Sequence, residues 1–280
     1  MRKRKARNGR RGGGNRQTQR GWRKWNRERP WLKFAILSAV MVLGLWLGWG
    51  CWQTIEEVGI ETQGYYAALA VAVPVRAQDF EGKKLVALTF DDGPSATTTG
   101  RLLDILAEKG VRATFFVLGS RAEQNPEILR RQVTEHEVGS HTVGHIDMTK
   151  MSVEAVRADT ETMRGVIAAA GGELRLVRPP YGSIGAAARE GTGTPLVLWT
   201  VDPEDWRVRD AATVRQRVVE ATYDGAIVLM HDIYESTMEA VGGIIDDLRA
   251  QGYEFLTVSE LAEVRGVEMV EGVAYGSFRP

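Results

Sequence analysis

The sequence is poor in cysteine and histidine. Cys51 is the single cysteine among 280 residues. One thiol cannot form an intrachain disulfide, so the fold must be held by its apolar core, alone or together with a bound metal ion. The chain has four histidines, so each of them is a candidate for a specific role. We find no internal repeat, and a repeat architecture is therefore not expected.

Acidic residues are scarce at the N-terminus, and the net charge of zero hides two regions of opposite charge. Residues 1–33 contain 14 Lys and Arg and one acid, Glu28, whereas the remaining chain contains 22 basic and 35 acidic residues. A basic arm of this kind can bind nucleic acid or anionic lipid. The apolar segment that follows argues against a nucleic-acid partner, and we expect the arm to orient a membrane span.

Residues 34–52 form a run of 19 uncharged, mostly apolar residues, which is long enough to cross a bilayer. Positive charge directly before such a span keeps the N-terminus in the cytoplasm. We therefore expect a single-pass anchor in the cell membrane, a linker at 53–82 and a domain outside the cell. A signal cleaved after Ala77 would instead release a secreted protein.

The region 83–265 has the size of one domain and alternates two kinds of pattern. Short apolar runs predict strands at 85–90, 113–117, 196–201 and 226–230, and helical spacing predicts helices at 99–109, 126–134, 153–170, 212–222 and 238–251. This alternation predicts an α/β fold with a parallel sheet, open or closed into a barrel. Residues 266–280 are expected to be a short C-terminal tail without chemistry.

Chemically active side chains follow three of the predicted strands. These are Asp91–Asp92, the segment 202–205 and His231–Asp232. In parallel α/β folds the carboxyl ends of the strands meet at one edge and carry the site. We therefore expect the three segments to contribute to one shared site.

His141 and His145 are four residues apart, and on a helical turn they would share a face and bind one metal ion. With one carboxylate from Asp91 or Asp92 they would leave positions open for water and substrate, and the other carboxylate could take a proton from metal-bound water. Alone, an HxxxH pair is more often a solvated helix face, and an acidic turn explains Asp-Asp-Gly-Pro. His136 matches no ligand spacing and is interpreted as a surface or packing residue.

Three further segments offer supporting groups. Arg178 lies in a stiff Pro-rich loop and could hold the free aspartate ionised, while the backbone N–H in that loop could face an oxyanion. Asp205 could orient a histidine, and Trp206 could form a pocket wall. His231 closes a buried strand and suits a general acid near neutral pH. Each segment alone also fits an ordinary loop or a satisfied core histidine.

Taken in order and spacing, five segments resemble the motifs of the polysaccharide deacetylase family, the NodB-homology group or carbohydrate esterase family 4. They are TFDDGP at 89–94, HTVGH at 141–145, RPPYG at 178–182, DPEDW at 202–206 and LMH at 229–231. The resemblance covers about residues 83–264 and implies a distorted (β/α) barrel. It also implies metal-dependent removal of acyl groups from extracellular or cell-wall glycan.

The resemblance assigns roles to single residues. It implies that Asp92, His141 and His145 are the metal ligands, most often of zinc. It implies that Asp91 is the general base and His231 the general acid.

The supporting roles follow from the same motifs. The resemblance implies that Arg178 steers the base, that Asp205 tunes the acid and that the backbone of Tyr181 contacts the oxyanion. The substrate-binding residues would be Pro180, Tyr181, Trp206 and Leu229.

The expected activity is N-deacetylation of cell-wall glycan. An outward-facing, tethered site favours peptidoglycan N-acetylglucosamine or N-acetylmuramic acid. Chitin-type oligomers and poly-N-acetylglucosamine are alternatives, and acetyl-xylan esterase chemistry uses the same motifs. A tethered glycan-binding module without turnover is the alternative from another class. We expect the catalytic domain to be monomeric.

Overall fold

The computed structural model describes residues 77–280, beginning with a 3₁₀ turn at Ala77–Phe80. Its central strand is β1 (Lys84–Asp91), in which every residue after the first is buried. Leu85 and Ala87 belong to one apolar cluster, whereas Val86, Leu88 and Phe90 belong to another. A strand covered on both faces reads as a continuous apolar run, which is why the sequence predicts it clearly.

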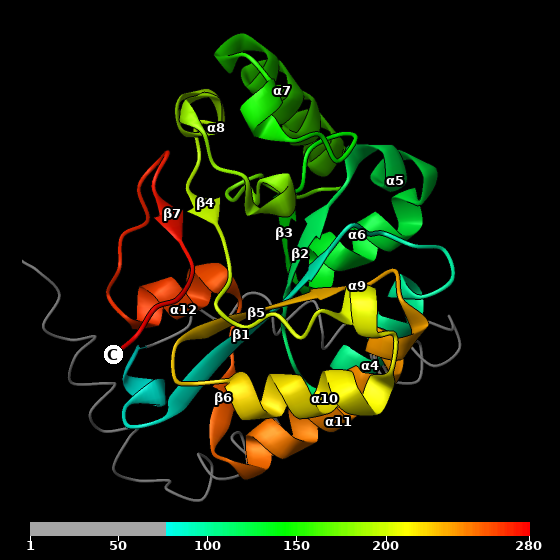
Figure 1. Ribbon diagram of the computed structural model, residues 1–280, viewed down its shortest axis with the longest axis vertical. Helices are drawn as coiled ribbons and strands as arrows, with labels where there is room; N and C mark the ends of the chain where they lie inside the picture. Colours follow the sequence, from blue (N-terminus) through cyan, green and yellow to red (C-terminus); the bar gives the residue numbers. More distant parts are fainter. Residues whose placement is uncertain (1–76) are drawn as a thin grey trace, which may run out of the picture. The chain divides into compact units, whose positions relative to one another are not determined.

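All strands of the main sheet are parallel (Figure 1). The strand β1 lies between β2 (Thr114–Val117) and β5 (Ala226–His231), and β3 (Glu137–Ser140) pairs with the far side of β2. The short β6 (Tyr253–Phe255) pairs with the first residues of β1. Parallel strands bring their carboxyl ends to one edge, and this edge positions the site.

Backbone pairing continues beyond the sheet and closes it into an irregular barrel. Val177 bridges Ser140 at the end of β3 and Leu196 in β4 (Leu196–Val197), and Val201 bridges Val228 in β5. The pairing therefore runs from β1 through β2, β3 and β4 and returns through β5. The α/β architecture expected from the sequence is confirmed.

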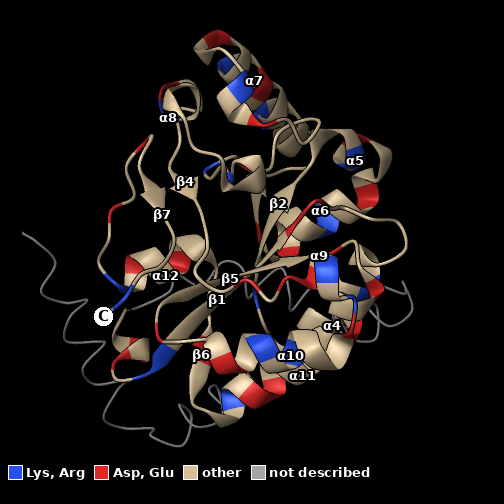
Figure 2. Cartoon of the chain, in the orientation of Figure 1, with Lys and Arg blue, Asp and Glu red and all other residues tan. Residues whose placement is uncertain are grey.

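Helices pack around the strands, and charged residues of both signs are mixed along α7, α10 and α11 (Figure 2). The helices are α4 (Thr99–Lys109), α5 (Gly119–Gln124), α6 (Pro126–Glu135), α7 (Val153–Ala169), α8 (Ala186–Gly191), α9 (Asp205–Val208), α10 (Ala211–Ala221), α11 (Glu235–Ala250) and α12 (Val258–Val264). All five predicted helices are present. The elements that the sequence did not predict are seven residues long or shorter, namely α5, α8, α9, α12, β3, β6 and β7 (Ala274–Tyr275).

The last fifteen residues pack into the domain. The strand β7 pairs with β4, and the Phe278 side chain is buried in the cluster that contains Leu85 and Ala87. The Phe278 N–H donates to the Gly225 carbonyl oxygen at 2.8 Å. Residues 266–280, expected to be a tail, therefore contribute to the core.

The expected basic arm, the anchor at 34–52 and most of the linker lie outside the described residues. Within residues 77–280 the structure contains no helix that is both long and apolar enough to span a bilayer.

Candidate active site and metal centre

The site is built where the strands end. Asp91 is the last residue of β1 and is paired in register with His231, the last residue of β5. His141 directly follows β3. The expectation that these segments share one edge is confirmed, because parallel pairing fixes their strand ends side by side.

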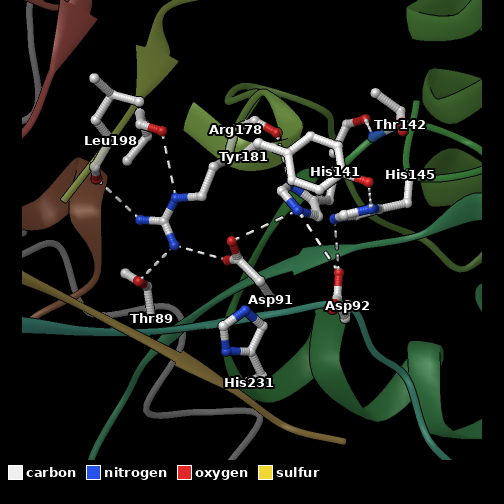
Figure 3. A network of polar contacts seen from close by, with 12 residues as sticks. Thr89, Asp91, Asp92, His141, Thr142, His145, Arg178, Tyr181, Leu198 and His231 are labelled. Atoms are coloured by element: carbon white, nitrogen blue, oxygen red, sulfur yellow. Dashed lines mark hydrogen bonds and ion pairs between the residues drawn. The ribbon is translucent and has the colours of Figure 1, made fainter. Parts of the chain in front are cut away.

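Three potential ligand atoms face a common centre (Figure 3). Asp92 Oδ1 lies 3.7 Å from His141 Nε2 and 3.4 Å from His145 Nε2. One ligand atom from each of these residues lies within 4.8 Å of the other two. Asp92 Oδ1 is buried and has no hydrogen-bond partner among residues 77–280. A buried carboxylate oxygen without a partner is costly unless a cation completes it, so the residues present fit a divalent metal ion.

Hydrogen bonds at the far sides of the rings orient both imidazoles. His141 Nδ1 lies 2.7 Å from the Arg178 carbonyl oxygen, to which it donates. The proton is then on Nδ1, and Nε2 is free to act as a ligand. His145 Nδ1 lies 3.1 Å from the Tyr181 hydroxyl. Two imidazole nitrogens and one carboxylate oxygen form a donor set that suits zinc and similar divalent ions.

The expectation that His141 and His145 lie on a helical turn is wrong. Residues 141–145 form a loop, in which Thr142 has φ 70° and His145 has φ 57°. Ser140 and Thr142 hydroxyls accept from backbone N–H groups within this loop, at 3.0 and 3.1 Å. The two imidazoles converge, with ring centres 5.0 Å apart, because of left-handed turns and not because of helical spacing.

Asp91 is 2% exposed and is held by a fully buried arginine. Arg178 Nη1 donates to Asp91 Oδ1 and to the Thr89 hydroxyl, both at 2.7 Å. Its other nitrogens donate to the carbonyl oxygens of Val197 and Leu198 at 3.3 and 3.1 Å. Burial lowers the pKa of Arg178, but the adjacent Asp91 carboxylate raises it and supports the charged form. Such a pair fixes one carboxylate oxygen and leaves the other available.

The available oxygen, Asp91 Oδ2, lies 3.7 Å from His141 Nε2 and therefore beside the metal centre. The guanidinium carbon of Arg178 lies 4.1 Å from the centre of the Phe116 ring inside the barrel. This contact stabilises a cation that has no access to water. The sequence hypothesis that Arg178 holds an aspartate therefore has direct geometric support.

His231 is held by Asp205, which is fully buried. Asp205 Oδ1 lies 2.8 Å from His231 Nδ1 and accepts from the Trp206 N–H at 2.9 Å. Its Oδ2 accepts from the His231 N–H at 2.8 Å and from the Thr237 hydroxyl at 2.7 Å. Burial lowers the pKa of His231, but the hydrogen bond and charge of Asp205, with the charges of Asp91 and Asp92, raise it to about 9. His231 is therefore protonated at neutral pH and can donate a proton from Nε2.

The residues expected to contact substrate are Pro180, Tyr181, Trp206 and Leu229. Tyr181 has a left-handed backbone (φ 62°) in the 3₁₀ turn Pro180–Gly182, and its side chain is 67% exposed. Among the described residues no acceptor takes the Tyr181 N–H. Trp206 is 47% exposed, whereas Pro180 and Leu229 are buried. The two aromatic rings therefore offer the surfaces that a sugar can contact.

The sequence placed Asp232, which directly follows His231, at the shared site but gave it no role of its own. Its Oδ2 accepts from the Thr99 hydroxyl at 2.7 Å, and its Oδ1 is buried without a partner in the part of the chain that the structure describes. A Cβ added at Gly93 would lie 2.1 Å from Asp232 Oδ2. Burial, together with the charges of Asp92 and Asp91, raises the pKa of Asp232 to about 7. The sequence signal was present, because this acid ends a buried strand, but the family motif stops at His231.

His136 lies away from the site and is a packing residue. It is buried, and its ring centre lies 5.2 Å from that of Phe115. Burial, with a smaller effect of nearby arginines, lowers the pKa of His136 to about 3. It is therefore neutral at all physiological pH values, which confirms the packing interpretation.

Comparison with known proteins links this geometry to one family. The polysaccharide deacetylase family model matches residues 79–193. Peptidoglycan-N-acetylglucosamine deacetylase PgdA of Listeria monocytogenes is 42% identical over 209 residues, covering 74% of this chain and 45% of that protein. Peptidoglycan-N-acetylmuramic acid deacetylase PdaC of Bacillus subtilis is 42% identical over 197 residues, covering 70% and 42%. The chain thus spans less than half the length of these two relatives.

Two further comparisons extend over nearly the whole of the matched chain. A peptidoglycan-N-acetylglucosamine deacetylase of Bacillus cereus is 37% identical over 188 residues, covering 64% of this chain and 88% of that protein. A solved structure of PdaC from Bacillus subtilis has 44% identity and a TM-score of 0.63, covering 66% of this chain and 93% of the solved chain. The similarity therefore extends over a complete folded domain.

Proposed function

The chain belongs to the polysaccharide deacetylase family, and on that premise we propose that it is a metal-dependent N-deacetylase of cell-wall glycan. One observation carries the proposal. The three ligand-type side chains of Asp92, His141 and His145 meet beside a carboxylate and a protonated histidine that are paired in register, Asp91 and His231. A base and an acid with different environments at one metal centre suit hydrolysis of an amide.

A divalent ion held by Asp92, His141 and His145 would act as a Lewis acid on the acetamide carbonyl and would lower the pKa of water. Asp91, fixed through one oxygen by Arg178, accepts the proton of the attacking water at its other oxygen.

The remaining steps use the backbone N–H of Tyr181 and the side chain of His231. The free Tyr181 N–H donates to the oxyanion that develops on the carbonyl. His231 gives its Nε2 proton to the leaving nitrogen as the C–N bond breaks. Acetate leaves, and the sugar retains a free amine.

For the sugar we propose N-acetylglucosamine or N-acetylmuramic acid of peptidoglycan. The support is that three relatives with 37–42% identity are named as peptidoglycan deacetylases, of both sugars. Chitin-type and poly-N-acetylglucosamine oligomers are the second candidates, since the same chemistry acts on any N-acetylated sugar. The presence of both Asp91 and His231 argues against a glycan-binding module without turnover. We propose zinc as the metal because the donor set has two imidazoles and one carboxylate.

We further propose that residues 34–52 anchor the protein in the cell membrane, with the N-terminus inside and a monomeric catalytic domain outside. The 19-residue apolar run and the basic residues before it support this topology. Secretion after cleavage near Ala77 is the alternative, and we expect no nucleic-acid partner. Protease accessibility in intact cells tests this, because digestion of the domain from outside requires the proposed orientation.

The activity is tested with the full-length chain in detergent. Acetate release and new free amines are measured on peptidoglycan, chitin-type oligomers and acetylated xylan, before and after chelator and after return of zinc. We expect equal amounts of acetate and amine from peptidoglycan, abolished by chelator and restored by zinc. Wild-type protein that binds glycan but releases no acetate with zinc present would contradict the proposal.

A further inference from the structure

Unusual backbone conformations mark the site loops. Six non-glycine residues among those described have positive φ: Asp92, Thr142, His145, Tyr181, Glu204 and Arg209. The first four belong to the metal and oxyanion loops, and Glu204 directly precedes the histidine partner Asp205. Left-handed backbone costs free energy in non-glycine residues and gathers at functional sites. Arg209, at φ 53°, is the sixth residue, and neither the family motifs nor the mechanism above gives it a role.

The Arg209 side chain is fixed by two contacts. Its Nε donates to the Trp206 carbonyl oxygen at 2.7 Å. Its guanidinium carbon lies 3.4 Å from the centre of the Tyr234 ring. A guanidinium on an aromatic face is held by a cation–π contact and keeps its outer N–H donors free.

Arg209 differs in its partners from other arginines of the domain. Within the described part of the chain no carboxylate lies within 4.0 Å of it. Arg207, in the short helix α9 that ends just before Arg209, is paired with Glu204, and Arg215 on α10 is paired with Asp247. An exposed arginine that lacks an acid but is held in place can bind an anion with little loss of side-chain entropy.

The position of Arg209 places such an anion next to the reacting sugar. The ring centre of Tyr234 lies 5.6 Å from that of His231, the proposed proton donor. Burial raises the pKa of the Tyr234 hydroxyl, and the charges of Arg209, Asp92, Asp205 and Arg121 also act on it. The stacked pair therefore lies beside His231, and Arg209 is bonded to the backbone of the exposed Trp206.

We propose that Arg209, stacked on Tyr234, binds a carboxylate of the glycan beside the sugar being deacetylated. This inference deepens the proposed function and depends on it. The planar N–H fork of a guanidinium matches a carboxylate in two hydrogen bonds. In peptidoglycan the carboxylate comes from the lactyl ether of muramic acid or from the stem peptide, whereas chitin-type glycans carry neither. Arg209 would thus favour peptidoglycan over neutral glycans.

The test combines one enzyme change with one substrate change. The kcat/KM of full-length wild type, Arg209→Gln and Arg209→Lys is measured on intact peptidoglycan and on glycan strands freed of peptide. Each substrate is used as such and after conversion of its carboxylates to amides. Arg207→Gln is the matched control, because it removes the same charge two residues away from a guanidinium that already has a carboxylate partner.

Arg209→Gln should lower kcat/KM by about tenfold on the carboxylate form, the size of a charged hydrogen bond at a partly exposed site. On the amide form, Arg209→Gln should change kcat/KM by no more than about twofold. Arg209→Lys should retain part of the preference for the carboxylate form over the amide form. A loss on freed strands identifies the lactyl carboxylate, and a loss confined to intact peptidoglycan identifies the peptide. The preference should weaken as salt concentration rises.

Three results would overturn the inference. Equal losses on carboxylate and amide forms would show that Arg209 acts through the position of Trp206, and no loss on either would show that it does not contact substrate. The same preference change in Arg207→Gln would assign the effect to general surface charge. Failure of the wild type to release acetate from any of these substrates would contradict the proposed function instead.

Discussion

Replacing Asp205 by Asn should move the pH dependence of the reaction. Asp205 supplies the hydrogen bond and the largest charge effect among the groups that raise the pKa of His231 from 6.5 to about 9 against the effect of burial, and Asp91 and Asp92 add smaller effects. A difference of about 2.5 in pKa corresponds to about 3 kcal/mol of interaction with the protonated ring. Without the carboxylate, we expect the pKa of His231 to return to 6.5 or below.

The size of the effect depends on pH in a defined way. A general acid works only when protonated, and at pH 8 a histidine of pKa about 9 is about 90% protonated, whereas one of pKa about 6.5 is about 3% protonated. At pH 6 both are mostly protonated. The ratio of wild-type to Asp205→Asn kcat should therefore grow by about twentyfold between pH 6 and pH 8.

The contribution of His231 to the stability of the fold should also decrease as pH rises. Because folding raises the pKa of His231, its contribution to stability is fully present below pH 6.5 and is lost as pH rises through about 9. The stability difference between wild type and Asp205→Asn should thus shrink toward high pH, as measured by urea unfolding.

Thr237→Val is the control for the Asp205→Asn experiment. This variant removes one hydrogen bond to Asp205 Oδ2 but keeps the carboxylate, so the alkaline limb of the pH–rate profile should stay near 9. An Asp205→Asn enzyme whose alkaline limb coincides with that of the wild type would refute the acid assignment.

Two further predictions concern packing in the domain. Gly93→Ala should destabilise the domain by about 1–3 kcal/mol because the added Cβ would lie 2.1 Å from Asp232 Oδ2. The control is Gly100→Ala in helix α4, where open space surrounds the added Cβ, and this variant should be neutral or stabilising. Equal unfolding midpoints for the two variants would contradict the close approach of Gly93 to Asp232. Phe278→Ala should cost about 3–5 kcal/mol in chemical unfolding because the ring is buried against the barrel, and a cost below about 1 kcal/mol would show that residues 266–280 are a detachable tail.

The sequence predicted the strands and helices in which an apolar run or a helical spacing extends over many residues. The buried strands β1, β2 and β5 and the longer helices were found because apolar runs and helical spacing persist over enough residues to be recognised. The short strands β3, β6 and β7 have no such signal. Their position is set by pairing with β2, β1 and β4, which depends on the whole fold.

In the site, too, some features could be predicted from the sequence and others could not. The chemical types at the strand ends and the partnership of Arg178 with Asp91 could be predicted, since a buried carboxylate needs a cation. The loop carrying His141 and His145 could not, because groups distant in sequence also hold its backbone: the Gly119 N–H donates to the Thr142 carbonyl oxygen, and Asp159 accepts from the Val143 N–H, both at 3.1 Å. Local spacing therefore suggested a helix where the structure has none.

The division of labour between two adjacent carboxylates is the central claim, and bound zinc measured together with acetate release tests it most directly. Asp91 faces Arg178, whereas Asp92 faces the two imidazoles. The full-length Asp91→Asn protein should keep one zinc ion per chain and lose at least about a hundredfold in kcat. Asp92→Asn should lose zinc and activity together. An Asp92→Asn protein that retains wild-type zinc affinity, or an Asp91→Asn protein with full activity, would contradict this assignment.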